Sequence, residues 1–90
     1  MPSADYNPVV VHLEGEIDLE TADHVVHELA RAAEISEDVI IDLKDVTFID
    51  STGIGLLAQA IGKGATLALE GAPEHVLRVI ELAGLTEPLA

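Results

Sequence analysis

The spacing of hydrophobic and polar residues changes period several times along the chain. Residues 9–14 form a run rich in β-branched side chains, and from position 12 to position 18 the residues alternate one by one, as in a strand with one exposed face. Gly15 lies inside this run and predicts a bend or β-bulge. Asp18 then stands where a helix should begin, as a candidate N-cap. The helix that follows has one apolar stripe, made of Ala22, Val25, Val26, Leu29, Ala32 and Ala33.

The middle of the chain contains the longest aliphatic run. Residues 39–43 are almost all apolar, which predicts a central strand covered on both faces, as in a parallel sheet. Lys44 and Asp45 interrupt this run, so residues 46–49 are expected to form a second short apolar piece. A helix is expected from about Thr52 to Ile61, with Gly62 and Gly64 ending it.

The last third of the chain predicts one more strand and one more helix. Residues 66–70 have the composition of a strand, and Pro73 suits the first position of a helix. Gly84 followed by Leu85 predicts a Schellman ending, with Leu85 returning onto Ile80. Strands and helices therefore alternate, which predicts an α/β fold: a mainly parallel central sheet with helices packed on it and right-handed crossovers. At 90 residues there is room for one domain, expected at residues 9–90 after a loose lead-in at residues 1–8.

Charge and composition restrict the partners of this domain. The chain has seventeen Asp and Glu residues but only four Lys and Arg residues, which gives a formal net charge of −13. Such a surface repels nucleic acid and anionic lipid, so we expect no nucleic-acid partner and no direct membrane contact, but a protein partner with a more basic face. Tyr6 and Phe48 are the only aromatic residues, too few for a base-stacking platform. The start has no signal-peptide pattern and no apolar run reaches 18 residues, so the expected compartment is the cytoplasm.

The segment from Asp50 to Gly55 carries the most chemical information. It lies where a predicted strand ends and a helix begins, the edge at which α/β sheets collect ligands. The free N–H groups of a helix N-terminus favour an anion, and a serine hydroxyl there could be phosphorylated. The alternative is that Asp50, Ser51 and Thr52 merely cap the helix.

Enzyme motifs do not fit this segment. A P-loop needs Lys followed by Ser or Thr, whereas Lys63 is followed by Gly64 and lies after the helix. A nucleophile elbow needs Gly two places before the serine, and Ile49 stands there. We therefore expect no enzymatic activity.

The histidines offer little metal chemistry. His24 and His27 lie three apart on a helix, but zinc takes three or four ligands and the chain has no cysteine. We therefore interpret His24 and His27 as surface residues. His12 and His75 are isolated in the sequence. Neither a metal nor a cofactor is expected. Glu14, Glu16 and Asp18 share one strand face, where they could meet a cation or a basic partner, or simply face solvent.

Taken together, these residues resemble the STAS domain, most closely the bacterial anti-sigma factor antagonists. The resemblance runs from about His12 to about Leu85. It is carried by Leu13-Glu14-Gly15-Glu16-Ile17-Asp18, Thr21-Ala22, Val39-Ile40-Ile41-Asp42-Leu43 and Val46-Thr47-Phe48-Ile49-Asp50-Ser51-Thr52-Gly53-Ile54-Gly55.

The resemblance implies a partner-switching mechanism in transcription regulation. An anti-sigma factor that is also a serine kinase would phosphorylate the position of Ser51, and only the unphosphorylated antagonist would bind it and free the sigma factor. A phosphatase would reset the switch, and ATP would belong to the kinase. The partner-binding residues would be Asp18, Asp50, Thr52, Gly53, Ile54 and Gly55.

Further expectations come from the resemblance. The helix after the motif is shorter than expected from the family, and the chain is expected to be truncated relative to it. The alternative function within the family is a STAS subunit of a membrane-transport complex that binds an ATP-binding cassette ATPase. In such subunits the first hydroxyl residue of the motif is often Thr, so the serine at position 51 favours the antagonist.

Overall fold

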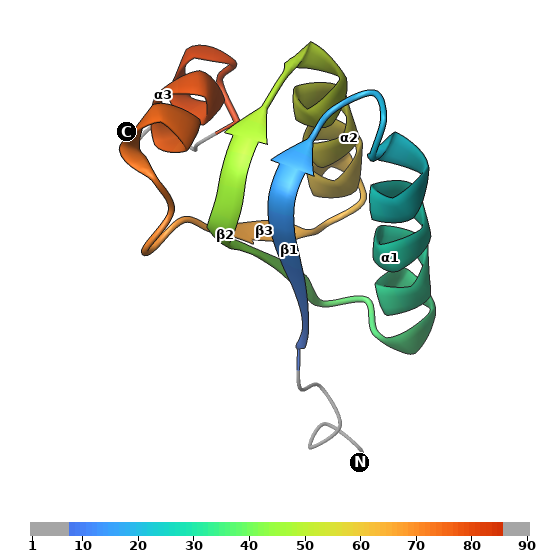
Figure 1. The fold of residues 1–90 in the computed structure, drawn as a ribbon. Helices are drawn as coiled ribbons and strands as arrows, with labels where there is room; N and C mark the ends of the chain where they lie inside the picture. The colour runs from blue at the N-terminus through green and yellow to red at the C-terminus, as the bar shows by residue number, and fades with distance from the viewer. Residues whose placement is uncertain (1–7, 86–90) are drawn as a thin grey trace.

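Residues 8–85 are described by a computed structural model, in which strands and helices alternate along the chain (Figure 1). The expected lead-in falls almost entirely on residues 1–7, which lie outside the described residues, so the domain boundary stays a prediction. The elements in chain order are β1 (Val9–Ile17), α1 (Ala22–Ile35), β2 (Val39–Ile49), α2 (Ser51–Gly62), β3 (Thr66–Ala68) and α3 (Glu74–Leu82).

The sheet is parallel, with β2 between β1 and β3. The predicted parallel sheet and the central place of residues 39–43 are therefore confirmed. β2 has 11 residues against 9 in β1, and two register shifts, between His12 and Glu14 and between Gly15 and Glu16, absorb the difference. Gly15 has φ of +74°, a backbone conformation that glycine adopts without strain, so the irregularity expected there is confirmed.

Two strand boundaries differ from the predictions. β2 runs unbroken through Lys44 and Asp45, so the predicted interruption is wrong. Both side chains are exposed, and the backbone N–H of Lys44 donates to Oδ1 of Asp42 at 3.0 Å, so a polar pair fits within an irregular stretch of strand. The third strand is shorter than predicted and ends at Ala68.

The sheet is covered on one face. A single hydrophobic cluster joins the sheet to all three helices. The strands contribute Val11, Leu13, Ile41 and Leu43, and the helices contribute Val25, Ala32, Leu57, Val76 and Ile80. Ile40 and Asp42 on the opposite face of β2 are half-buried, and Val10 beside them on β1 is 45% exposed. The prediction that β2 is covered on both faces is therefore wrong, because Ile40 and Asp42 remain partly exposed on the face opposite the hydrophobic cluster.

The helices end much as the sequence predicts. α2 spans Ser51–Gly62, one residue longer at each end than expected. At the end of α3 the N–H of Leu85 donates to the carbonyl of Ile80 at 3.2 Å and that of Gly84 to Glu81 at 3.0 Å, with φ of +76° at Gly84, which confirms the Schellman ending. Pro73 is the N-cap residue of α3 rather than its first helical residue. No helix within residues 8–85 is long and apolar enough to cross a bilayer.

Candidate functional site

The ends of β1 and β2 bring two acidic residues to the same edge of the sheet. Ile17 and Ile49, the last residues of the two strands, are register partners, and the N–H of Asp50 donates to the carbonyl of Ile17 at 3.2 Å. Asp18 and Asp50 follow these partners directly. The turn into α2 and the loop before α1 therefore leave the sheet side by side (Figure 1).

Asp50 is the N-cap of α2. Its Oδ1 accepts a hydrogen bond from the N–H of Gly53 at 3.0 Å, and its backbone carbonyl accepts from Ile54 at 2.9 Å. The backbone of Asp50 is extended, as an N-cap requires. The cap interpretation of this segment is therefore correct for Asp50, whose carboxylate is used by the helix.

Ser51 is the first residue of α2 and is exposed. The cap hydrogen bond comes from Asp50, so the hydroxyl of Ser51 is not needed to hold the helix. Thr52, the neighbouring hydroxyl, is half-buried. Of the two adjacent hydroxyl residues, Ser51 is thus the more accessible.

The two glycines of the motif have different surroundings. Gly53 is buried, and a β-carbon there would overlap with Ile17 and Ile49, so this position serves close packing of α2 on the strand ends. Gly55 is exposed and has nothing within 4 Å of the place of a β-carbon. Ile54 is half-buried. Of these three motif residues, Gly55 offers the most open surface.

Asp18 is not the N-cap of α1, which begins three residues later than the sequence predicts. Oδ1 of Asp18 accepts hydrogen bonds from the N–H of Glu20 at 3.0 Å and of Thr21 at 3.1 Å. The hydroxyl of Thr21 accepts from the N–H of Asp18 at 3.0 Å and donates to the carbonyl of Glu16 at 2.8 Å. These hydrogen bonds hold residues 18–21 in a turn, so α1 begins only at Ala22.

Two exposed apolar side chains near this edge were missed by sequence reasoning. Leu19, in the turn before α1, is 74% exposed, and Phe48, two residues before Asp50, is 46% exposed. The signal for Leu19 was present, since it lies between Asp18 and Glu20 outside any apolar stripe. Phe48 belongs to the short apolar piece of residues 46–49, whose pattern does not distinguish a buried face from an exposed one.

The local charge at this edge has one sign. Residues 16–23 and 47–55 contain five carboxylates and neither lysine nor arginine. A phosphate attached here would find no cation within these two segments. The site is therefore unsuited to holding a free anion through side chains, but well suited to a large change in potential when an anion is added covalently.

The histidines lie elsewhere. His24 and His27 are exposed on α1, and residues 8–85 contain no group of three or more side chains that could hold a metal ion. His12 and His75 both have partners that the sequence did not reveal. Nδ1 of His12 lies 2.9 Å from Oδ2 of Asp42 across the strand pair, and Nε2 of His75 lies 2.6 Å from the carbonyl oxygen of Thr47.

Comparisons with known proteins identify the family. The STAS domain profile matches residues 3–89. The chain belongs to the STAS domain family.

Individual relatives and solved structures are similar over most of this chain. It is 34% identical to an anti-sigma-B factor antagonist of Bacillus subtilis over 85 residues, which are 90% of this chain and 78% of that protein. Its fold is similar to that of the anti-sigma factor antagonist SpoIIAA in its unphosphorylated form, with a TM-score of 0.70 at 22% identity over 89% of this chain and 75% of the other. It is also similar to the STAS domain of a SulP transporter from Vibrio cholerae, with a TM-score of 0.62 at 26% identity over 87% of this chain and 64% of the other.

Proposed function

We propose that this domain is an anti-sigma factor antagonist, a binding protein rather than an enzyme, whose affinity for its partner is switched by phosphorylation of Ser51. The observation that carries the proposal is the exposed position of Ser51 at the start of α2, immediately after the capping residue Asp50. The Bacillus subtilis relative named as such an antagonist supports it.

The charge at the site supports the direction of the switch. A phosphoserine carries about −1.5 to −2 charges at pH 7. On Ser51 it would stand next to Asp50 and close to the turn at Asp18, in a chain that already has a net charge of −13. A partner packed over this edge would have to accept both the bulk and the charge of the phosphate. Binding is therefore lost without any refolding of the domain.

The partner would be an anti-sigma factor that is also the serine kinase, and a phosphatase would remove the phosphate. The contact face of the anti-sigma factor would be more basic than this domain, to match the carboxylates of Asp18 and Asp50, but would pack too closely over Ser51 to admit a phosphate. Thr52, Ile54 and Gly55 would extend the contact along α2, while the buried Gly53 would keep the helix in place. The exposed side chains of Leu19 and Phe48 would add apolar area beside the charged residues.

The test uses the purified protein and its anti-sigma factor kinase, identified by pull-down. With ATP and Mg²⁺, wild type should gain one phosphate, which fragment mass spectrometry places on Ser51. Ser51→Ala should block the modification and bind the kinase as wild type does, and Ser51→Asp should weaken binding by at least tenfold. Thr52→Val is the matched control and should still be phosphorylated.

Phosphate on Thr52 alone, or wild-type affinity in Ser51→Asp, would overturn the proposal. The alternative within the family is a subunit that binds a transport ATPase. It predicts instead that the protein binds an ATP-binding cassette subunit, and that Ser51→Asp does so as tightly as wild type.

A further inference from the structure

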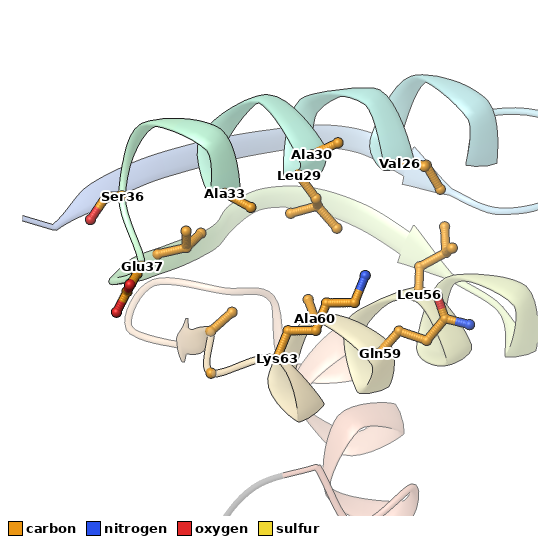
Figure 2. A pocket seen from close by; sticks show the side chains of 13 residues that line it. Val26, Leu29, Ala30, Ala33, Ser36, Glu37, Leu56, Gln59, Ala60 and Lys63 are labelled. Carbon is orange, nitrogen blue, oxygen red and sulfur yellow. The ribbon is translucent and has the colours of Figure 1, made fainter.

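A groove of about 560 Å³ lies between α1 and α2, away from the edge that carries Ser51 (Figure 2). Its volume falls in the range of roughly 300–1,000 Å³ that is typical of small-molecule sites. The walls come from both helices, and the floor is formed by β2 at Val39. Most of the lining side chains are aliphatic.

The groove exists because small residues stand where two helices could otherwise interlock. On α1, Leu29 points toward the small Ala60 of α2, and Ala33 is small as well, while Leu56 lies further toward the start of α2 (Figure 2). Both Ala30 and Ala33 are exposed to solvent although they belong to the groove wall. An apolar ligand would therefore displace water from aliphatic surface that the fold itself leaves uncovered.

One cation projects into this apolar space. The side chain of Lys63 extends from the end of α2 and places its ammonium group between the two helices, beside the amide of Gln59 (Figure 2). Among residues 8–85 the only ion pair within 4.0 Å is that of His12 with Asp42, so Lys63 has no carboxylate partner there. It is one of only four basic residues in a chain with 17 acidic ones.

The groove also carries one carboxylate, away from the Lys63 ammonium group (Figure 2). Glu37 lies in the loop after α1, at the end where the chain enters β2 (Figure 2). It would repel a second negative group, so a ligand with a single anionic head and an uncharged chain fits best. The net charge of −13 also argues that no anion is held here by general attraction.

We propose that this groove binds an aliphatic monocarboxylate, with its carboxylate between Lys63 and Gln59 and its chain along Leu29, Ala33 and Ala60. The ammonium and amide groups donate hydrogen bonds to the carboxylate oxygens, and the alanines leave room for the methylene chain. The site is separate from the proposed phosphorylation site, because Lys63 and Ser51 lie at opposite ends of α2.

The experiment titrates sodium decanoate, below its micelle concentration, into the full chain and follows amide shifts by NMR and heat by calorimetry. Saturable binding is expected, with the largest shifts at Ala33, Ala60 and Lys63. Decanol, which lacks the charge, and acetate, which lacks the chain, should each bind at least tenfold more weakly.

Variants separate the two halves of the site. Lys63→Met should weaken decanoate binding about tenfold, the loss expected for one hydrogen bond to a charged group. Lys44→Met removes a lysine outside the groove and should bind as wild type does. Ala33→Phe should fill the groove and abolish binding, whereas Ala58→Phe, exposed on α2 outside the groove lining, should not.

Three results would overturn the proposal. The first is the absence of saturable decanoate binding to the folded wild-type protein. The second is equal affinity in wild type and Lys63→Met, and the third is a set of shifts centred outside the groove. None of these results depends on Ser51, so the proposed function stands or falls separately.

Discussion

Gly53 in α2 lies directly against Ile17, the last residue of β1. A β-carbon at position 53 would overlap with the carbonyl oxygen of Ile17 and lie 2.8 Å from its Cγ2 and 2.7 Å from Cγ1 of Ile49. The same carbonyl accepts the hydrogen bond of Asp50. This close approach fixes the start of α2, and with it Ser51, beside the turn that contains Asp18.

Gly53→Ala is expected to lower the free energy of unfolding by about 1–3 kcal/mol, because the added methyl group overpacks a site bounded by backbone. Gly55→Ala is the matched control in the same helix and has open space around it. It should leave stability unchanged or raise it by up to about 1 kcal/mol, the gain in helix propensity. Urea unfolding of both variants measures the difference, and equal stability of the two would contradict this packing.

The cap of α2 gives a second prediction. Asp50→Ala should lower the free energy of unfolding by about 1 kcal/mol, because the N–H of Gly53 loses its acceptor. Ser51→Ala should change it by less than about 0.5 kcal/mol, as for other exposed positions. Thermal unfolding at several urea concentrations measures the stability of both variants. A larger loss of stability in Ser51→Ala than in Asp50→Ala would make Ser51 the structural residue of this turn.

Much of the fold could be predicted from local signals. The parallel sheet follows from the alternation of strand and helix patterns, and the Schellman ending follows from Gly84 and Leu85 alone. The open face of the sheet could not be predicted in this way. Ile40 belongs to an unbroken aliphatic run, yet it is half-buried, because the hydrophobic cluster forms on the face of β2 that carries Ile41 and Leu43.

The candidate site was predictable in its residues but not in their roles. The motif names Asp50 and Ser51, and the family resemblance names Asp18, but hydrogen bonds that depend on the folded turns decide which carboxylate caps a helix. The carboxylate of Asp18 accepts a hydrogen bond from the turn before α1, and the carboxylate of Asp50 accepts one from α2. Likewise the pairing of His12 with Asp42 depends on strand register, which the sequence does not specify to the residue.

The central strand provides a third prediction. Ile41 is fully buried, and Ile41→Asp should abolish cooperative folding, because an unpaired buried charge costs several kcal/mol against a total stability of roughly 5–15 kcal/mol. Val10→Asp places the same charge on the open face of the adjacent strand and should keep a cooperative transition. Circular dichroism during heating distinguishes the two. A sharp transition in Ile41→Asp would disprove the burial.

Asp42 predicts a dependence of stability on pH. The backbone N–H of Lys44, followed by the charges of Lys44 and His12 and the hydrogen bond from His12, outweighs desolvation and lowers the pKa of Asp42 below its ordinary value of 3.8. The ionised carboxylate therefore stabilises the fold above pH 3.8, and this contribution is lost as the pH falls through the lower folded-state pKa.

Unfolding free energies measured between about pH 2 and pH 6 test this dependence across the acid range in which linked carboxylates titrate. Asp42→Asn should be less stable than wild type at the upper end, with the difference shrinking towards the lower end. His12→Ala should keep most of the dependence, because the N–H of Lys44 is the larger cause. A constant difference between Asp42→Asn and wild type at every pH would contradict the shift.

The last prediction separates the structural role of Asp18 from its charge. Asp18→Asn keeps the oxygen that accepts from Glu20 and Thr21, so its stability should stay within about 0.5 kcal/mol of wild type, whereas Asp18→Ala should lose about 1 kcal/mol. If the carboxylate of Asp18 adds to the repulsion at Ser51, the loss of affinity for the anti-sigma factor caused by Ser51→Asp should be smaller in the Asp18→Asn background than in wild type. Calorimetric titration of the four proteins (wild type, both single variants and the double variant) measures this coupling. Strictly additive effects would show that Asp18 only shapes the turn, and that the charge next to Asp50 is enough to release the partner.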